Sequence, residues 1–175
     1  EKWCYVPWEI IPNLHLRKDS GVHQHYVDGS PTLYRYGDDM RLTFGLKRGG
    51  KQYYTLKVGT FVNNKYTYGS PSWGWKIDSN ILGDANPLGE SWSTPLPCKL
   101  KTPSGEVPAL IMSGGYDADN QEKATPAGTD TYGRSIFAVD QSNGSLLSSV
   151  LCLTPTQVPD FTHSNNAFFI NRNCL

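Results

Sequence analysis

From residue 23 onward the hydrophobic pattern consists of short runs of apolar and aromatic residues, separated by residues that favour tight turns. The turn signals are Asp28-Gly29, Gly37-Asp38-Asp39, Arg48-Gly49-Gly50, Asn63-Asn64, Ser104-Gly105 and Asn143-Gly144. Such residues mark turns between strands, and the intervening runs have the length of single strands. We therefore predict hairpins with strands at residues 31–36, 40–46, 52–58, 73–77, 92–100, 107–113, 134–139 and 145–153.

The N-terminal segment has a different pattern. Residues 2–6 alternate and are rich in aromatic side chains, which predicts one strand. Pro7 then stands where a helix can begin, and apolar residues follow at roughly helical spacing from Trp8 to Leu14. Because Pro12 falls inside this stretch, we expect a single short and irregular helix.

An internal repeat organises the predicted strands. Leu42-Thr43-Phe44-Gly45 followed by Tyr53-Tyr54-Thr55-Leu56 has the same order as Leu110-Ile111-Met112-Ser113-Gly114 followed by Ile136-Phe137-Ala138-Val139-Asp140. Each copy predicts a meander of short antiparallel strands, which cannot bury both of its faces alone. Stacking such units face to face buries their apolar residues, as the blades of a β-propeller do. The predicted fold is therefore all-β: a partial β-propeller with about two four-stranded blades, flanking strands and one short N-terminal helix.

We interpret residues 1–175 as a single partial propeller region. Residues 1–29 are expected to form the end of a preceding blade and the short helix, 30–78 the first blade, 91–153 the second blade, and 154–175 a tail or the start of a further blade. Known propellers close with roughly four to eight blades. We therefore expect the chain to be a fragment of a longer protein that supplies the remaining blades.

Composition and charge exclude some classes of partner. The 16 Lys and Arg residues balance the 16 Asp and Glu residues, so no overall field attracts nucleic acid or anionic lipid. Apolar runs such as 109–112 and 167–170 are far shorter than the roughly 20 residues of a membrane-spanning helix, and no membrane span is predicted. No charged-then-apolar leader opens the chain, so we expect any secretion signal to have been removed or to lie outside it.

The four cysteines, Cys4, Cys98, Cys152 and Cys174, are even in number and lack the C-x-x-C spacing of zinc or thioredoxin-like sites. Two disulfides suit an exported protein, and the preferred pair is Cys152 with Cys174. Buried thiols in a cytosolic protein are the alternative, because a sequence does not show connectivity.

Six segments rich in glycine and aromatic residues stand in a fixed order along residues 3–147. They are WCYVPWEIIP (3–12), HYVDGSP (25–31), FGLKRGGKQYYTL (44–56), LGESWSTP (88–95), GGYD (114–117) and GRSIFAVD (133–140). In order and content these segments resemble the C-terminal propeller of the PilC/PilY family of type IV pilus tip adhesins and assembly proteins. Two features depart from that family: Lys57 replaces the usual acidic residue, and residues 151–175 match no family segment.

The resemblance implies a propeller of quinoprotein-like type in an extracellular protein, exported through the periplasm to the pilus tip or cell surface. It implies a non-enzymatic role in type IV pilus biogenesis, cell adhesion and twitching motility. The implied partners are minor pilins of the tip complex, a host or abiotic surface, and the remaining blades of the same protein. The EF-hand-like calcium loop of the family, D-x-D-x-D-G, does not occur in this sequence, so no cofactor is expected here and calcium is expected elsewhere in the full protein.

Two other functions stay open. A carbohydrate-binding surface module is one, because Trp73, Trp75, Trp92, Tyr53 and Tyr54 offer flat ring faces to a sugar, although core packing is the preferred interpretation of these rings. A fragment of a quinone-dependent dehydrogenase propeller is the other. Such enzymes often use adjacent cysteines, and this sequence has no Cys-Cys pair.

The segment 115–132 is the best candidate for a contact surface, because it is longer than an ordinary hairpin loop. Asp117, Asp119, Asn120 and Asp130 supply oxygens of the kind that calcium prefers. The segment lacks the glycine register of an EF-hand loop. A solvated insertion is therefore the preferred interpretation, with a calcium site as the alternative.

The remaining candidate residues are interpreted as structural. The pair His23 and His25 could share a metal from one face of a strand, but no carboxylate or cysteine completes the set at a recognisable spacing. Ser91 and Ser93 lack the G-x-S-x-G elbow of a hydrolase. The basic turn Lys47-Arg48-Gly49-Gly50-Lys51 suits a carboxylate or a phosphate, and a solvated hairpin tip is the preferred interpretation.

Overall fold

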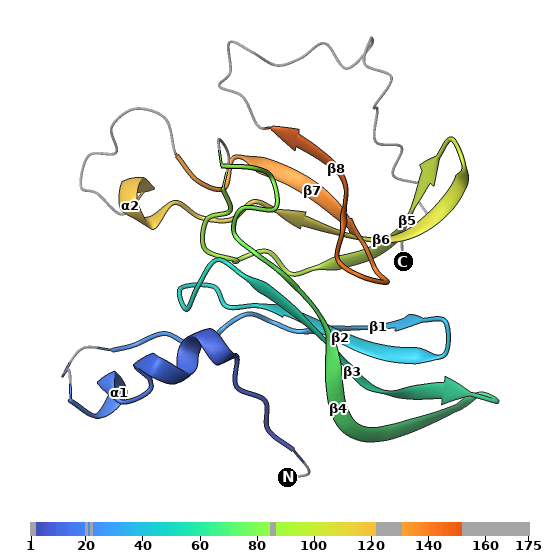
Figure 1. Cartoon of the computed structure of the whole chain (residues 1–175), viewed down its shortest axis with the longest axis horizontal. Coiled ribbons are helices and arrows are strands. Elements are labelled where there is room, and N and C mark those ends of the chain that lie inside the picture. Colours follow the sequence, from blue (N-terminus) through green and yellow to red (C-terminus); the bar gives the residue numbers. More distant parts are fainter. Residues whose placement is uncertain (1–2, 20, 22, 85–86, 122–130, 152–175) are drawn as a thin grey trace.

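The computed structural model describes residues 3–19, 21, 23–84, 87–121 and 131–151, which form two antiparallel sheets, one above the other (Figure 1). The strands follow chain order within each sheet, as β1-β2-β3-β4 and β5-β6-β7-β8. Their bounds are β1 Thr32–Tyr36, β2 Asp39–Gly45, β3 Tyr53–Val62, β4 Lys65–Ile77, β5 Leu96–Thr102, β6 Gly105–Ser113, β7 Ser135–Asp140 and β8 Leu146–Leu151. The prediction of an all-β fold with two four-stranded meanders is confirmed.

Short turns with positive φ angles make each sheet a meander. Asn63 and Asn64 join β3 to β4 with φ of 51° and 57°. Positive φ at both central residues is the pattern of a type I′ turn, whose twist matches that of the flanking strands. Gly37 joins β1 to β2 with φ of 59°, where a residue with a side chain is strained. Local turn chemistry therefore sets the order of the strands.

The described helices are short. The 3-10 helix η1 (Trp8–Asn13) follows Pro7, as predicted, and contains Pro12. Two further helices of four residues each, α1 (Leu16–Asp19) and α2 (Ala118–Gln121), were not predicted. None of the helices in the described ranges is long and apolar enough to cross a lipid bilayer.

The strand predicted at residues 2–6 is wrong. Residues 3–7 carry no strand assignment and pair with no strand in the part of the chain that the structure describes. Instead, the Tyr5 ring packs against the outward face of the first sheet, with its centroid 6.3 Å from that of Phe44 and 6.4 Å from that of Tyr54. The alternation of large side chains therefore reflects packing on a sheet face, not membership of a ladder.

Three further sequence predictions differ from the structure at strand ends. The strands β3 and β4 extend to the Asn63-Asn64 turn, well beyond the predicted 52–58 and 73–77, because irregularities in pairing accommodate glycine and proline residues that disfavour regular strands. The strand β5 begins at Leu96, not at residue 92, since Ser91 forms only an isolated bridge. No strand in the described residues precedes Asp28-Gly29, so this pair is not a hairpin turn.

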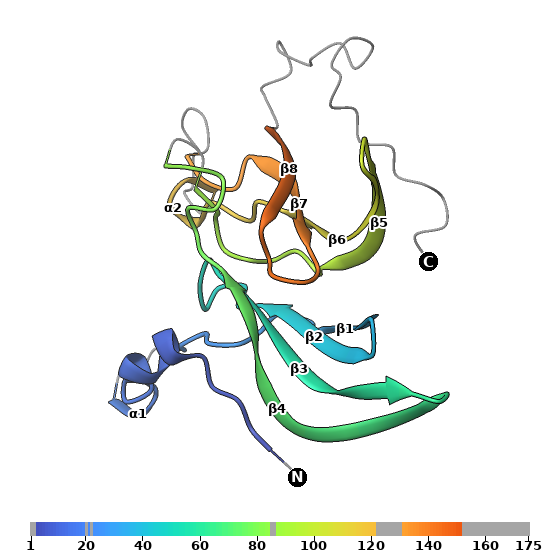
Figure 2. The ribbon, with the colours of Figure 1, turned by 45° about the vertical axis from the view of Figure 1, so that its right-hand side comes forward.

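The hydrophobic core lies mainly between the two sheets, and both views show β4 passing from the first sheet toward the second (Figures 1 and 2). This cluster comprises Tyr34, Tyr53, Trp75, Ile77, Leu88, Leu110, Met112, Phe137 and Val139. A second cluster on the outward face of the first sheet comprises Ile10, Met40, Phe44, Leu46, Tyr54, Leu56 and Val58. A third on the outward face of the second sheet comprises Cys98, Leu100, Ala109 and Ala138. Each sheet therefore buries apolar residues on both faces.

Candidate functional site

The two sheets meet in a head-to-tail arrangement of their repeated positions. Phe44 and Tyr54 of the first sheet point outward, away from the second sheet. Their counterparts in the sequence repeat, Met112 and Phe137, point into the core between the sheets. The face of the second sheet that packs against the first sheet is therefore the equivalent of the outward face of the first sheet. An arrangement of this kind joins two different faces, and repeated copies close into a ring when the rotation between them allows it.

A rigid turn between β7 and β8 reaches across this junction. The amide of Gly144 donates to the carbonyl of Asp140 at 2.9 Å, and the amide of Ser142 donates to the Asp140 carboxylate at 2.6 Å. The amide of Asp140 in turn donates to the carbonyl of Ser145 at 2.9 Å. These bonds hold the carbonyls of Gln141 and Ser142 in place before the first sheet contacts them.

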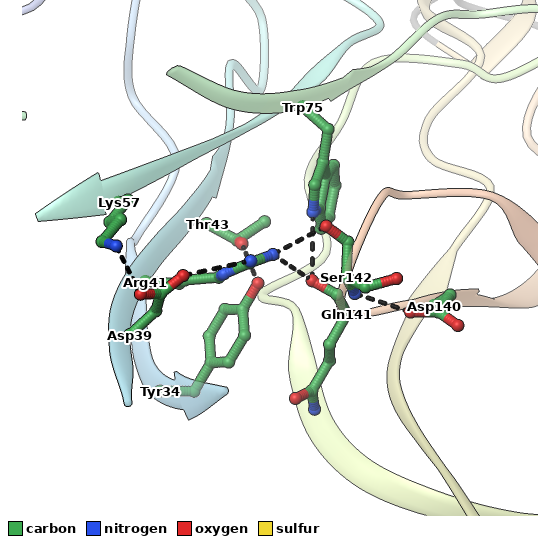
Figure 3. Close-up of polar contacts among 9 residues, drawn as sticks. All are labelled: Tyr34, Asp39, Arg41, Thr43, Lys57, Trp75, Asp140, Gln141 and Ser142. Atoms are coloured by element: carbon green, nitrogen blue, oxygen red, sulfur yellow. Dashed lines mark hydrogen bonds and ion pairs between the residues drawn. The ribbon is translucent and has the colours of Figure 1, made fainter. Parts of the chain in front are cut away.

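Trp75 and Arg41, both of the first sheet, donate hydrogen bonds to this turn (Figure 3). The indole Nε1 of Trp75 donates to the carbonyl of Gln141 at 3.1 Å. The Nη1 atom of Arg41 donates to the carbonyls of Gln141 and Ser142 at 2.6 and 2.8 Å. Gly144 lies against the Trp75 ring so closely that a Cβ atom there would be 2.7 Å from Trp75 Cε3. The turn therefore fits a site formed by two side chains of the other sheet.

Neighbouring charges orient Arg41. Its Nη2 atom lies 3.4 Å from the Asp39 carboxylate, and its guanidinium stacks 4.6 Å from the centroid of the Tyr36 ring. Asp39 also pairs with Lys57. The Lys57 ammonium, followed by the Arg41 guanidinium, holds the pKa of Asp39 below its usual range. The Asp39 carboxylate therefore stays charged and orients the Arg41 guanidinium, which donates to the turn.

Buried polar groups behind this junction are hydrogen-bonded. The Oγ1 atoms of Thr43 and Thr55 lie 2.6 Å apart, and that of Thr43 donates to the Tyr34 hydroxyl at 3.2 Å. Burial raises the pKa of Tyr34, which keeps its hydroxyl neutral. From the second sheet, the Gln141 side chain donates to the carbonyl of Ala109 at 2.8 Å. Paired polar groups of this kind help to specify the register in which the sheets meet.

Ser91 connects the two sheets at another point, beside the turn between β2 and β3. Its hydroxyl accepts the amide of Leu46 at 2.7 Å and donates to the carbonyl of Gly50 at 3.1 Å. Its backbone bonds the amide of Lys47 at 3.3 Å and the carbonyl of Gly50 at 3.1 Å. The basic turn therefore joins the two strands of a hairpin, and its backbone is also fixed against the segment that leads to the second sheet.

Asp117 closes the loop between β6 and β7 at its two ends. Its carboxylate Oδ2 accepts the amide and the hydroxyl of Thr131 at 2.7 and 3.1 Å, and the amide of Tyr132 at 3.3 Å. Burial opposes ionisation of this side chain, but these hydrogen bonds outweigh burial and hold its pKa below the usual range. The charged Asp117 carboxylate therefore ties the start of the loop to its end at Thr131 and Tyr132.

The other members of the predicted calcium set are dispersed or lie outside the described residues. Asp119 is exposed and Asn120 is buried in α2, whereas Asp130 falls within 122–130, outside the described ranges. Within those ranges no group of three or more His, Cys, Asp or Glu side chains is placed to hold a metal ion. The calcium site stays a prediction.

The histidine pair lies beside a cavity of about 600 Å³ near the N-terminal segment. The rings of His23 and His25 have centroids 4.5 Å apart in an edge-to-face arrangement. Tyr5, Val6, Ile10 and Leu14 line one part of the cavity, and residues 23–28 line the rest. The structure thus brings the two histidines together, but on an irregular segment and not on one face of a strand.

The aromatic residues proposed as a sugar platform separate into two groups. Tyr53, Tyr54 and Trp75 are buried, and for them the expectation of core packing is confirmed. Trp73 and Trp92 are 58% and 42% exposed, so the expectation is wrong for these two. Trp73 lies within β4, and Trp92 lies on the segment that precedes β5.

The cysteines and serines show structural environments. Cys4 is exposed, Cys98 is buried, and the two do not form a disulfide with each other. The preferred pair, Cys152 and Cys174, lies outside the described residues. Ser91 is 1% exposed and uses its hydroxyl in the contacts given above, which does not suit a nucleophile.

Sequence reasoning missed the residues that join the sheets. Arg41 and Gln141 lie 100 positions apart, and neither stands in a recognised motif. The sequence does contain one signal for this turn. Asn143-Gly144 follows the repeated segment that ends at Asp140, as Asn63-Asn64 follows the first copy of the repeat.

Comparisons with known proteins add no name to this arrangement. No protein-family model matches the chain, and neither the curated proteins nor the solved structures contain a significant match.

Proposed function

We propose that this chain is a non-enzymatic stacking unit of a larger quinoprotein-like β-propeller, and that it serves type IV pilus biogenesis and adhesion at the pilus tip or cell surface. The head-to-tail contact between the two sheets carries the first part of this proposal. The ordered segments that resemble the PilC/PilY family carry the second part.

The outward face of the second sheet is suited to receive another sheet. In a head-to-tail stack, this face corresponds to the face of the first sheet that meets the second. It presents Ile136 and Leu96, which are 48% and 47% exposed, beside the partly buried Ile111 and Leu147. Covering these side chains removes apolar surface from water, which favours stacking by about 25 cal/mol for each Å² buried.

The opposite end of the stack also offers an apolar site. A cavity of about 250 Å³ opens on the outward face of the first sheet, between the N-terminal segment and the sheet. Its lining includes Trp3, Tyr5, Val27, Leu42 and Phe44. A cavity of roughly 150 Å³ already holds a benzene ring. This site therefore suits one large apolar side chain from a preceding sheet.

The family-like segments meet in space, which supports the resemblance on physical grounds. Gly49, in residues 44–56, lies so close to residues 25–31 that a Cβ atom would be only 1.6 Å from the Tyr26 carbonyl oxygen. Such contact requires glycine, because any side chain would displace the backbone opposite. Two of the resembling segments, 25–31 and 44–56, therefore pack directly against each other.

A charge placed on the outward face tests the stacking. We expect Ile136→Lys, introduced into the native polypeptide, to reduce its resistance to proteolysis by at least about tenfold, because a lysine buried between sheets is desolvated. Val62→Lys at the β3–β4 turn is a matched control, since Val62 is 47% exposed and lies on neither stacking face of the second sheet. Equal resistance of the two variants would count against the stack.

Association with the pilus tip tests the cellular role. We expect the native protein to co-purify with minor pilins, and deletion of its gene to reduce surface pili and adherence. Correctly folded protein that captures no minor pilin, in cells whose piliation survives the deletion, would refute the pilus assignment. A bound quinone, detected by its absorbance, would instead favour a dehydrogenase.

A further inference from the structure

Two lysines of the turn between β2 and β3 rest on aromatic rings from the second half of the chain. The Nζ atom of Lys51 lies 3.4 Å from the centroid of the Tyr132 ring, and that of Lys47 lies 5.5 Å from the centroid of the Trp92 ring. Ring faces attract cations and hold them without neutralising their charge. The two ammonium groups therefore have defined positions although they lie at the surface.

The backbone holds this cluster in advance of any ligand. Lys47 has a φ of 51°, a left-handed conformation that is uncommon for a residue with a side chain. Its amide is bonded to Ser91 at 3.3 Å, and the amide of Gly50 closes the turn onto the Lys47 carbonyl at 3.1 Å. An unusual conformation that is fixed by surrounding bonds is characteristic of a preorganised site.

Neighbouring carboxylates leave these two lysines unpaired. Asp28 and Glu90 stand on the segments that pack against the turn, and the Glu90 carboxylate accepts the Trp92 indole Nε1 at 2.9 Å. In the described part of the chain, neither Lys47 nor Lys51 forms an ion pair. Their ammonium groups therefore keep donors for an external anion.

Trp92 adds an apolar surface next to these charges. It is 42% exposed, its indole nitrogen is held by Glu90, and its ring meets the Tyr116 ring edge to face at 6.1 Å. A fixed and partly accessible indole suits the apolar face of a sugar ring, while a bare inorganic anion makes no use of it.

From this combination we propose that Lys47, Lys51 and Trp92 form a binding site for a saccharide that carries a carboxylate. The lysine ammonium groups bind the carboxylate, and the indole packs against the sugar ring. The site lies entirely within this chain and goes beyond the proposed function, since it requires neither a further sheet nor a pilus.

The test measures binding of tri-galacturonic acid to the complete chain by titration calorimetry and ligand-observed NMR. We expect saturable binding, and we expect the Kd to rise by at least about tenfold in the double variant Lys47→Gln/Lys51→Gln and in Trp92→Ala. Lys101→Gln and Trp8→Ala are matched controls, because both residues are exposed and lie away from the turn; their Kd should stay within about twofold. Circular dichroism verifies that each variant is folded.

Comparison ligands separate the proposal from simpler explanations. Binding of neutral maltotriose as tight as that of tri-galacturonic acid would overturn the role of charge. Inorganic phosphate or a tri-glutamate peptide that binds equally well, with Trp92→Ala unaffected, would reduce the site to a general anion site and overturn the saccharide assignment. Absence of saturable binding by the folded wild-type chain would refute the proposal outright.

Discussion

Gly144 offers a direct measurement of how closely the two sheets fit. Replacing it by alanine would place a Cβ atom 2.7 and 2.8 Å from Cε3 and Cδ2 of Trp75. Carbon atoms in contact normally lie about 3.5–4.0 Å apart, so the overlap is roughly 1 Å. We expect Gly144→Ala to lower the free energy of unfolding by about 1–3 kcal/mol through this overpacking. The positive φ of 75° should lower it by about 1–2 kcal/mol more.

Gly37 separates these two contributions. Its φ is 59°, and a Cβ atom there would meet nothing within 4 Å. Gly37→Ala should therefore lower the free energy of unfolding only by the cost of backbone strain, about 1–2 kcal/mol. The assay is urea unfolding followed by circular dichroism. The reasoning is refuted if Gly144→Ala and Gly37→Ala lower the free energy of unfolding equally, or if Trp75→Ala fails to relieve the excess cost of Gly144→Ala in a double-mutant cycle.

Three further predictions concern charged groups. Arg41→Met should lower the free energy of unfolding by about 2–4 kcal/mol in urea titrations, because it removes a nearly buried donor to two carbonyls. Arg35→Met, which removes an ion pair at a 51% exposed side chain, should lower it by less than about 1 kcal/mol. Similar losses in the two variants would contradict the role of Arg41. Asp117→Asn should lower the free energy of unfolding by about 1–3 kcal/mol, and each kcal/mol should lower the thermal midpoint by about 2–4 °C. The exposed Asp119→Asn should change the midpoint little. An unchanged midpoint in Asp117→Asn would exclude a stabilising role of the Asp117 hydrogen bonds. Glu9 has a pKa lowered to about 2, by the Lys76 ammonium first and the Tyr54 hydroxyl second, so Glu9→Gln should lose about 1 kcal/mol at neutral pH, the pair being partly exposed. The depressed pKa makes this contribution complete above about pH 4.5 and removes it as pH falls through about 2, so a difference between wild type and Glu9→Gln that persists below pH 2 would contradict the assignment.

Strand prediction succeeded where the responsible interactions are local. Asn63-Asn64 and Ser104-Gly105 mark hairpin turns in both sequence and structure, because their backbone angles depend on the residues themselves. It failed at residues 2–6, where an alternating aromatic pattern serves packing against Phe44 and Tyr54. Pattern alone does not distinguish a strand from a segment that lies on a sheet.

The candidate sites show the same division. His23 lies beside His25 although the strand expected there is absent, because two alternate residues of one segment are close whatever the remaining fold. The environment of the basic turn could not be foreseen, since Trp92 and Tyr132 approach Lys47 and Lys51 from distant parts of the chain. Exposure of Trp92 likewise depends on which segments cover it.

The sequence by itself determined the all-β class, the order of the strands and the division into two similar units, because alternation and turn residues act over a few neighbouring positions. The tertiary structure alone decided which face of one sheet meets the other, and that Arg41 and Trp75 hold the turn at Gln141. These contacts join residues 66 and 100 positions apart. They depend on how two complete sheets fit together, and no local preference encodes that fit.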